Sequence, residues 1–255
     1  MFCCRNLVSS DDVELVDTEK KSTGYIERSD LSFGVKLGEG EFGTVYKGTT
    51  VQGAPVSVAV KTCHATTALA EAYVLRELEH PHIVTFIGVS FGETGLPLIV
   101  LELAPVGDLR NHLIDNKADV PLSTLLLYGH QLSAALSFVH HKRYLHRDIA
   151  ARNVLVASHK CVKLSDFGLA RYIGNEDSYD ARGEAERLPI RWMAPESLPG
   201  PFTFKSDVWT FGSCRVCGLE VGPDRRVTTG IVGRSVIYWQ HFKSKLSCEM
   251  ERFDG

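Results

Sequence analysis

The sequence lacks any apolar run long enough to cross a membrane. Its longest apolar stretches, around residues 96–100 and 125–128, fall far short of the roughly 20 residues that a membrane-spanning helix needs. The first residues of the chain also lack the long apolar segment of a secretory signal. We therefore expect no membrane span in this chain.

A strong excess of either charge is also missing. The chain carries 28 Lys and Arg against 31 Asp and Glu, a formal net charge of −3, which provides no general attraction to nucleic acid. At 255 residues, 44% of them apolar and 23% charged, the composition is that of a globular protein and excludes disordered and fibrous classes. The length fits one large domain or two smaller ones.

The seven cysteines show no disulfide framework. An odd number without regular spacing indicates free thiols in a reducing compartment. Cys214 and Cys217 form a single C-x-x-C pair, which is too little for a structural zinc site because zinc takes four ligands. Cys3 and Cys4 are either plain terminal thiols, the interpretation we favour, or an acylation site.

The hydrophobic pattern divides the chain into segments of different character. Residues 1–27 are rich in acidic side chains and hold no regular period, which predicts a flexible linker. Residues 28–103 predict mostly strands, at 31–37, 44–48, 56–61, 84–90 and 97–103, with one helix at 68–78. Residues 104–212 predict helices at 109–114 and 122–141 and a small hairpin at 154–164. We therefore expect an α+β fold with two lobes and a ligand cleft between them.

A glycine-rich motif, Gly38–Gly43, joins the first two predicted strands. In dinucleotide-binding folds such a motif opens a helix, and an acidic residue follows about 20 positions later. Here a strand follows, and the residue 18 positions past Gly43 is Lys61. This favours a hairpin whose backbone lies over phosphates, because glycine permits close approach. A plain hairpin turn and a dinucleotide-dependent oxidoreductase remain the alternatives.

Lys61 ends an apolar strand, Val58–Lys61. In isolation such a lysine reaches the surface along its aliphatic stem. Glu71, on the following predicted helix, changes this interpretation, because an ammonium group held by a carboxylate can offer its remaining protons to phosphate oxygens.

Two further motifs, His146–Asn153 and Asp166–Gly168, bring carboxylates and an amide into neighbouring loops. Asp148, Asn153 and Asp166 together offer the hard oxygen ligands that suit Mg²⁺ and leave one carboxylate to accept a hydroxyl proton. Each of these residues alone could cap a turn. All the motifs in this order are hard to attribute to chance.

The ordered motifs, completed by Ala194–Glu196, resemble a protein kinase over residues 28–212. The resemblance implies a two-lobed protein-kinase-like fold, with an N-lobe at 28–103 and a partial C-lobe at 104–212. Ala150–Arg152 stands where serine/threonine kinases carry a lysine-bearing loop, and Leu188–Met193 resembles the tyrosine-kinase platform for a substrate phenol. The segments His80–Val84, His146–Val156 and Leu164–Tyr172 are most similar to the focal adhesion kinase family.

The resemblance implies a role for each motif residue. Lys61, oriented by Glu71, holds the α- and β-phosphates of ATP. Asp166 and Asn153 bind Mg²⁺, and Asp148 accepts the proton of the substrate tyrosine. The implied catalytic set is Lys61, Glu71, Asp148, Arg152 and Asn153. The implied ATP-binding set is Leu37, Gly38, Gly40, Phe42, Gly43, Val45, Ala59, Lys61, Leu101, Glu102, Ala104, Asp108 and Leu155.

The resemblance also implies a regulatory phosphorylation site and a cellular location. The segment Asp166–Glu196 resembles an activation loop, and Tyr179 lies where this family carries a phosphorylated tyrosine. Arg147 and Arg171 are expected to pair with that phosphate. We expect a non-receptor tyrosine kinase in the cytoplasm, at the inner face of the plasma membrane or at adhesion sites, acting on protein substrates with ATP and Mg²⁺.

Two features depart from the family pattern. Only ten positions separate Lys61 from Glu71, a short connection that either favours their ion pair or pulls the helix out of register. Beyond Gly212 the kinase pattern fades, so we expect an incomplete C-lobe and a divergent tail at 213–255 from an alternative splice, a frameshift or a faulty gene model. Glu196 then lacks its usual arginine, a costly arrangement if this carboxylate is buried. The alternative function is an impaired fragment that binds nucleotide or partners without turnover.

Overall fold

The structure is a computed structural model that describes residues 24–40, 43–52, 54–63, 65–116, 120–181, 193–198 and 200–213. Phe42, most of the predicted platform at 188–193, nearly all of the predicted linker and the tail beyond Ser213 lie outside these residues, as do Cys3, Cys4, Cys214 and Cys217. The chain divides into two compact units. The N-terminal unit comprises Met1–Glu79 and Val84–Leu103, and the C-terminal unit comprises His80–Ile83 and Ala104–Gly255.

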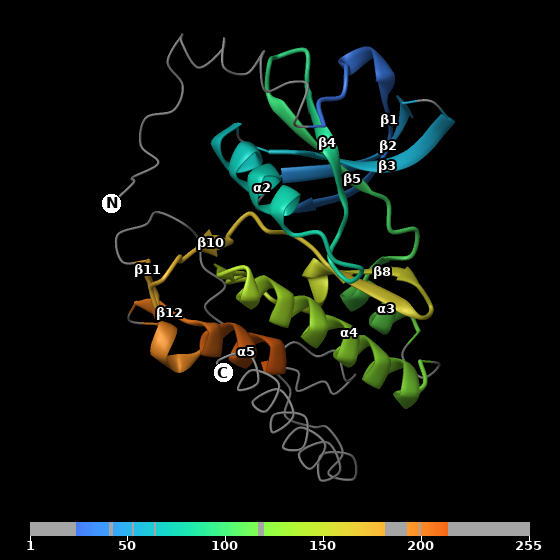
Figure 1. Ribbon diagram of the computed structural model, residues 1–255. Helices are drawn as coiled ribbons and strands as arrows, with labels where there is room; N and C mark the ends of the chain where they lie inside the picture. Colours follow the sequence, from blue (N-terminus) through green and yellow to red (C-terminus); the bar gives the residue numbers. More distant parts are fainter. Residues whose placement is uncertain are drawn as a thin grey trace. The chain divides into compact units, whose positions relative to one another are not determined.

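The N-terminal unit is built on a five-stranded antiparallel sheet in the order β1-β2-β3-β5-β4 (Figure 1). A short 3-10 turn, η1 (Arg28–Asp30), leads into it. The strands are β1 (Leu31–Gly40), β2 (Gly43–Gln52), β3 (Ala54–Thr62), β4 (Phe86–Phe91) and β5 (Pro97–Glu102). All five occupy segments that the sequence pattern predicts as strands.

One helix, α2 (Ala65–Glu77), lies against β4 and β5 (Figure 1). Its buried apolar side chains Ala68, Ala72 and Leu75 recur at helical spacing, which is the pattern that predicts the helix. On the sheet, Val58, Val60 and Val100 pack with Ile26 and Leu31 in a buried cluster. This cluster uses one face of β3 and β5 and leaves the alternate side chains to the other face.

Strand β1 corrects one expectation. Its alternating sequence predicts a half-buried strand, yet only Leu31 is buried in it, while Phe33, Val35 and Leu37 are exposed. β1 is an edge strand of the sheet, and no element within the described residues covers the outward part of its apolar side.

The described residues of the C-terminal unit form three α-helices, α3 (Leu109–Asp115), α4 (Leu122–His141) and α5 (Phe204–Ser213). A three-stranded sheet runs in the order β6 (Gly107–Asp108), β8 (Val154–Ser158) and β9 (Cys161–Leu164). Two short pairs join β7 (Tyr144–Leu145) to β10 (Arg171–Tyr172) and β11 (Tyr179–Asp180) to β12 (Pro201–Phe202). Two 3-10 turns, η2 (Ala151–Asn153) and η3 (Pro195–Ser197), complete the described elements of this unit.

Helix α4 is the central helix of this unit and packs against β9. By length and composition it is the one helix among the described residues that passes a test for a membrane span. Its polar groups are nevertheless used internally, since Tyr128 Oη donates to His159 O at 3.2 Å and Gln131 Nε2 donates to Lys160 O at 2.7 Å. These bonds fix α4 to the turn between β8 and β9, as expected of a core helix.

Helix α5 begins at a reciprocal cap. Ser206 N donates to Thr203 Oγ1 at 3.2 Å, and Thr203 N donates to Ser206 Oγ at 3.0 Å. Such a cap satisfies backbone groups that a helix start leaves open. It fixes the first turn of α5, which carries the buried Asp207.

Candidate active site

The glycine-rich hairpin is closed by pairing of Gly40 with Gly43. Gly43 has φ +132°, and a Cβ there would lie 1.9 Å from Thr62 O, so the fold itself requires glycine at this position. At Gly38 and Gly40 a Cβ would meet no atom within 4 Å. The fold therefore does not demand glycine at those two positions, and their backbone faces open space that a ligand can approach.

Lys61 and Glu71 form a buried ion pair. Lys61 Nζ lies 2.8 Å from Glu71 Oε1 and 2.7 Å from Oε2, and the two side chains are 8% and 1% exposed. β3 ends at Thr62 and α2 begins at Ala65, so the short connection brings the helix close enough for the pair. Of the two outcomes that the spacing leaves open, the structure shows the one that favours the pair.

Three of the residues predicted to contact adenine, Val45, Ala59 and Leu101, share the sheet face that carries Lys61. Val45 pairs with Lys61 across β2 and β3, and Ala59 pairs with Leu101 across β3 and β5. Directly paired residues and those two apart along a strand point to the same face. Leu37, on the neighbouring edge strand, is 50% exposed.

The residues predicted to contact the base edge and ribose already have internal bonds. Glu102 N donates to Thr85 O at 3.0 Å, so a bond from Glu102 to a base would have to use its carbonyl oxygen. Asp108 caps α3, and its carboxylate accepts from Asn111 N at 2.9 Å and Asn111 Nδ2 at 2.7 Å.

Ala104 lies in the loop before β6, and its carbonyl accepts from Gly107 N. Leu155 lies in β8 of the C-terminal unit.

Asp148 is held by two neighbours on its own loop. Asn153 Nδ2 donates to both Asp148 O and Asp148 Oδ2 at 2.7 Å, and Arg152 Nη2 donates to Asp148 Oδ1. Asp148 is only 2% exposed. The turn η2 carries both donors, Arg152 and Asn153, four and five positions after Asp148, so this carboxylate is oriented by donors on both of its oxygens.

Asp166 is brought beside this loop by its neighbours in sequence. Ser165 N and Ser165 Oγ both donate to Asn153 O at 2.8 Å, and Phe167 packs on His146 with ring centroids 4.7 Å apart. Asp166 has φ +61°, a left-handed backbone that is uncommon outside glycine and tends to mark functional sites.

The donor set of the C-terminal unit fits a magnesium ion. Because Asn153 Nδ2 bonds to Asp148, the side-chain oxygen Oδ1 of Asn153 and the Asp166 carboxylate are the oxygens that could ligate a cation. No group of three or more His, Cys, Asp or Glu suited to a metal occurs among the residues that the structure describes. Mg²⁺ matches such a sparse set, because it typically takes one or two carboxylates and completes its shell with water and substrate phosphates.

The buried carboxylate of Asp207 fixes the backbone of the loop His146–Asn153, the predicted catalytic loop. Its Oδ2 accepts from His146 N at 2.8 Å and from His140 Nε2 at 3.1 Å, and its Oδ1 accepts from Arg147 N at 2.9 Å. Burial alone would raise the pKa of Asp207, but the hydrogen bond and charge of His140, together with His146, hold it below its ordinary value.

Tyr179 lies in a cage of two arginines and one aromatic ring. The Arg147 guanidinium lies 4.9 Å from the Tyr179 ring and 4.6 Å from the Phe202 ring. Arg171 Nε donates to Tyr179 Oη at 3.3 Å. The pairing of β11 with β12 sets Tyr179 opposite Phe202. The two arginines expected from sequence therefore both contact Tyr179.

Residues 31–221 match the family of protein tyrosine and serine/threonine kinases, which is three quarters of the chain. The chain belongs to the protein kinase family. This membership confirms the α+β kinase fold class expected from the sequence, with the glycine hairpin, the Lys61–Glu71 pair and the Asp148 loop as its motifs.

The chain is similar to several proteins named as tyrosine kinases. Tyrosine-protein kinase HTK16 of Hydra vulgaris is 40% identical over 73% of the chain, and human tyrosine-protein kinase ABL2 is 41% identical over 73%. The protein named inactive tyrosine-protein kinase kin-32, from Caenorhabditis elegans, is 41% identical over 77%. The expected resemblance to a tyrosine kinase catalytic domain is confirmed. The chain spans 26%, 16% and 24% of the length of these relatives.

Three contacts of the kinase site escape sequence reasoning. His140 contacts Asp207 across 67 positions of sequence, and Phe202 contacts Arg147 across 55 positions. No sequence motif links the members of either pair. Arg143 has a left-handed backbone and bonds to the loop after β10. The one sequence signal near these residues is the motif His146–Asn153.

Glu196 requires a correction. The sequence suggests a buried acid without its arginine, but Glu196 lies exposed on η3. An exposed carboxylate remains hydrated, so the expected energetic penalty does not arise in the structure.

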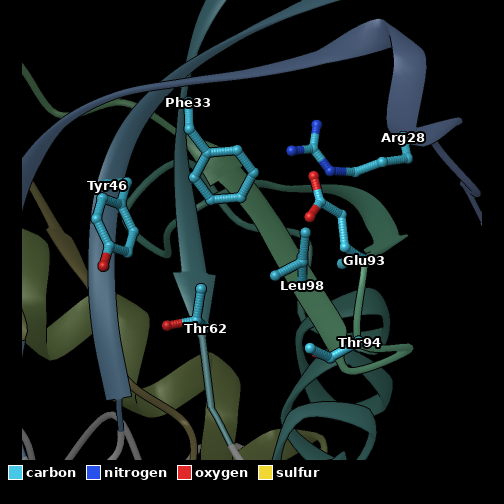
Figure 2. Close-up of a pocket in the computed structure, with 8 residues that line it drawn as sticks. Arg28, Phe33, Tyr46, Thr62, Glu93, Thr94 and Leu98 are labelled. Atoms are coloured by element: carbon cyan, nitrogen blue, oxygen red, sulfur yellow. The ribbon is translucent and has the colours of Figure 1, made fainter.

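A hollow of about 310 Å³ lies on the other face of the kinase N-terminal sheet. Tyr46, Thr62 and Leu98 line it, and Figure 2 shows Arg28 and Glu93 pointing toward one another beside Phe33. Tyr46 and Thr62 alternate with Val45 and Lys61 along their strands, so this hollow is separate from the face that carries the predicted ATP residues.

Proposed function

We propose that the protein is an ATP-dependent, non-receptor tyrosine kinase that phosphorylates tyrosines of protein substrates. The observation that carries the proposal is the pair of preorganised charged groups, Lys61 held by Glu71 and Asp148 held by Asn153 and Arg152. The tyrosine-kinase relatives support the substrate class. Of the predicted partners, ATP and tyrosine-bearing proteins belong to this proposal.

The proposed reaction assigns one task to each group. Lys61 holds the α- and β-phosphates, and the open backbone at Gly38 and Gly40 lies along them. Asp148 orients the tyrosine hydroxyl and takes its proton as the new P–O bond forms and the bond between the γ-phosphorus and its bridging oxygen breaks. Mg²⁺, held by Asp166 and Asn153, would neutralise charge on the phosphates. Most of the rate gain would come from positioning and charge neutralisation.

The adenine contacts belong to the same proposal. Val45, Ala59 and Leu101 would pack on the base from the sheet face of Lys61, with Leu37 and Leu155 completing the sandwich. Leu101 would act as gatekeeper, the Glu102 carbonyl and Ala104 N–H would bond to the base, and Asp108 would bond to the ribose.

Within tyrosine kinases we propose the focal adhesion kinase family. The support is the sequence of His80–Val84, of the catalytic loop and of Leu164–Tyr172. The proposed location is the cytoplasm, with the inner face of the plasma membrane or adhesion sites as the place of action. An antibody against the chain, applied to intact and permeabilised cells, tests this location.

Phosphorylation of Tyr179 is the proposed regulatory step. Arg147 and Arg171 already contact the Tyr179 side chain, and a phosphate at this position would exchange ring contacts for charge-assisted hydrogen bonds with the same guanidinium groups.

The second candidate function is a kinase-like protein without turnover. It is favoured by the relative named inactive, kin-32, which shares 41% identity with the chain. Such a protein would bind nucleotide or partners through the same fold.

One comparison separates the two candidates. The wild-type chain and Asp148→Asn are incubated with Mg-ATP and a poly-Glu-Tyr substrate, and phosphotyrosine is measured. We expect the wild type to exceed the variant at least 100-fold, because a general base typically contributes about 10²–10⁴-fold. Equal signals would refute the active-enzyme proposal. A nucleotide-dependent rise in Tm in the same samples would then support the non-catalytic candidate.

A further inference from the structure

Arg143 forms hydrogen bonds with residues 173–176, the segment that precedes Tyr179. Its Nε donates to Gly174 O at 2.6 Å, and its Nη2 donates to Glu176 O at 2.7 Å. Its own carbonyl accepts from Ile173 N at 2.9 Å. Three bonds from one residue thus hold the segment 173–176, which ends three positions before Tyr179.

The position of Arg143 is itself set by its surroundings. Its guanidinium lies 4.9 Å from the Phe204 ring, which also packs on His140 at 4.6 Å. Its backbone has φ +62°, and its N–H donates to His140 O at 2.8 Å, just past the end of α4. The side chain therefore starts from a rigid helix end and is aimed by an aromatic ring, which lowers the entropy lost in bonding to the loop.

The held segment and the cage of Tyr179 share one apolar cluster. Ile173, Phe202 and Ala181 are buried together, with Tyr179 and Phe204 packed against them. Arg143 thus contacts this cluster at Phe204, and Arg147 contacts it at Phe202. The hydrogen bonds of Arg143 to residues 173–176 fix the position at which the chain reaches this cluster. They therefore stabilise the conformation in which Tyr179 contacts Arg147, Arg171 and Phe202.

We infer that Arg143 is a positioning residue that keeps unmodified Tyr179 docked and thereby slows its phosphorylation. The inference rests on the proposed function, because it takes Tyr179 as a phosphorylation site. A docked tyrosine with its hydroxyl at Arg171 must leave the cage before another kinase can bind it in extended form. The rate of phosphorylation then follows the fraction of undocked chains.

The test supplies the phosphate from outside the protein. Every chain carries Asp148→Asn, and an added active tyrosine kinase domain phosphorylates Tyr179 in the protein and in a synthetic peptide of residues 173–182 in the same tube. The peptide, in which the tyrosine has no cage, provides the reference rate. The protein-to-peptide rate ratio therefore does not depend on whether this chain catalyses anything, and a failed activity assay does not affect the result.

Three variants define the expected pattern. Arg143→Asn removes the guanidinium but keeps a residue that tolerates a left-handed backbone, and we expect the ratio to rise about tenfold, the equivalent of one lost charge-assisted hydrogen bond. Arg143→Lys retains a cation with a single donor group and should fall between wild type and Arg143→Asn. Lys142→Asn is the matched control, since its ammonium lies over Phe138, away from the loop, and its ratio should equal that of the wild type.

Thermal unfolding of each variant separates positioning from general loosening. The inference requires the ratio to rise in Arg143→Asn while Tm stays near that of Lys142→Asn. An unchanged ratio in Arg143→Asn overturns it. An equal rise in Lys142→Asn, or no recovery in Arg143→Lys, overturns it as well, because either result would show that the specific guanidinium bonds do not govern access to Tyr179.

Discussion

Glu71 is the residue on which the buried charge of the N-terminal unit depends. Glu71→Gln leaves the Lys61 ammonium buried with a neutral partner, and we expect a loss of about 3–5 kcal/mol in the free energy of unfolding, as for other broken buried pairs. The measurement is chemical denaturation at pH 7. Because Lys61 then loses its orientation, the KM for ATP should rise in the same variant.

Two comparisons sharpen this prediction. Glu77→Gln, on the same helix, removes an exposed carboxylate 3.9 Å from Arg76 and should change stability by less than about 1 kcal/mol. The double variant Lys61→Met/Glu71→Leu replaces the pair by apolar groups and should recover most of the stability but none of the activity. If the double variant is as unstable as Glu71→Gln, unpaired charge is not the cause.

Single residues also show where sequence reasoning stops. Lys61, Asp148 and Asn153 can be predicted as site residues from the sequence because linear motifs carry them. His140 is not, because its partner Asp207 lies 67 positions away on another helix. Contacts that exist only after folding leave no local spacing to detect.

At the scale of elements, the β1–β2 hairpin separates a structural glycine from glycines that leave room for a ligand. Gly43→Ala would force a Cβ to 1.9 Å from Thr62 O and strain a backbone at φ +132°. We expect a loss of about 3 kcal/mol or more in the free energy of unfolding. Gly40→Ala meets open space, so its stability should change by less than about 0.5 kcal/mol. Its KM for ATP should rise about tenfold, because the new methyl group obstructs the phosphates.

These outcomes are read from denaturation curves and steady-state kinetics of the two variants. A Gly40→Ala enzyme with unchanged KM would contradict the assignment of this backbone to phosphates. A Gly43→Ala protein of normal stability would contradict the close approach of β2 to the end of β3.

The helices and strands differ in how reliably they can be predicted from their sequences. The helix predicted at 122–141 coincides with α4, because apolar residues repeat at helical spacing over its whole length. The strands β11 and β12 are two residues long, too short for any period to show, and 20 residues separate them in the sequence. The burial of β1 is predicted wrongly for another reason. Alternation of apolar and polar residues shows that a strand has an apolar face, but it does not show whether another element covers that face.

At the scale of the whole molecule, acid stability should depend on Asp207. Its pKa in the folded protein lies below the ordinary value of 3.8, so the unfolded chain binds this proton more readily. The stabilisation is therefore complete above about pH 5 and is lost as the pH falls through 3.8 and below. Asp207→Asn should cost about 2 kcal/mol at pH 7, because a charged acceptor of two backbone N–H groups becomes neutral.

The measurement is the free energy of unfolding of wild type and Asp207→Asn from pH 8 to pH 3. The difference between them should stay constant down to about pH 5 and shrink below that, since protonation makes the wild-type side chain neutral as well. Asp115→Asn, at an exposed position on α3, should give a small difference at every pH. A wild-type advantage that persists unchanged to pH 3 would mean that the Asp207 carboxylate is not the group whose charge holds the catalytic loop. The loop would then owe its conformation to packing alone, chiefly that of His146 on Phe167.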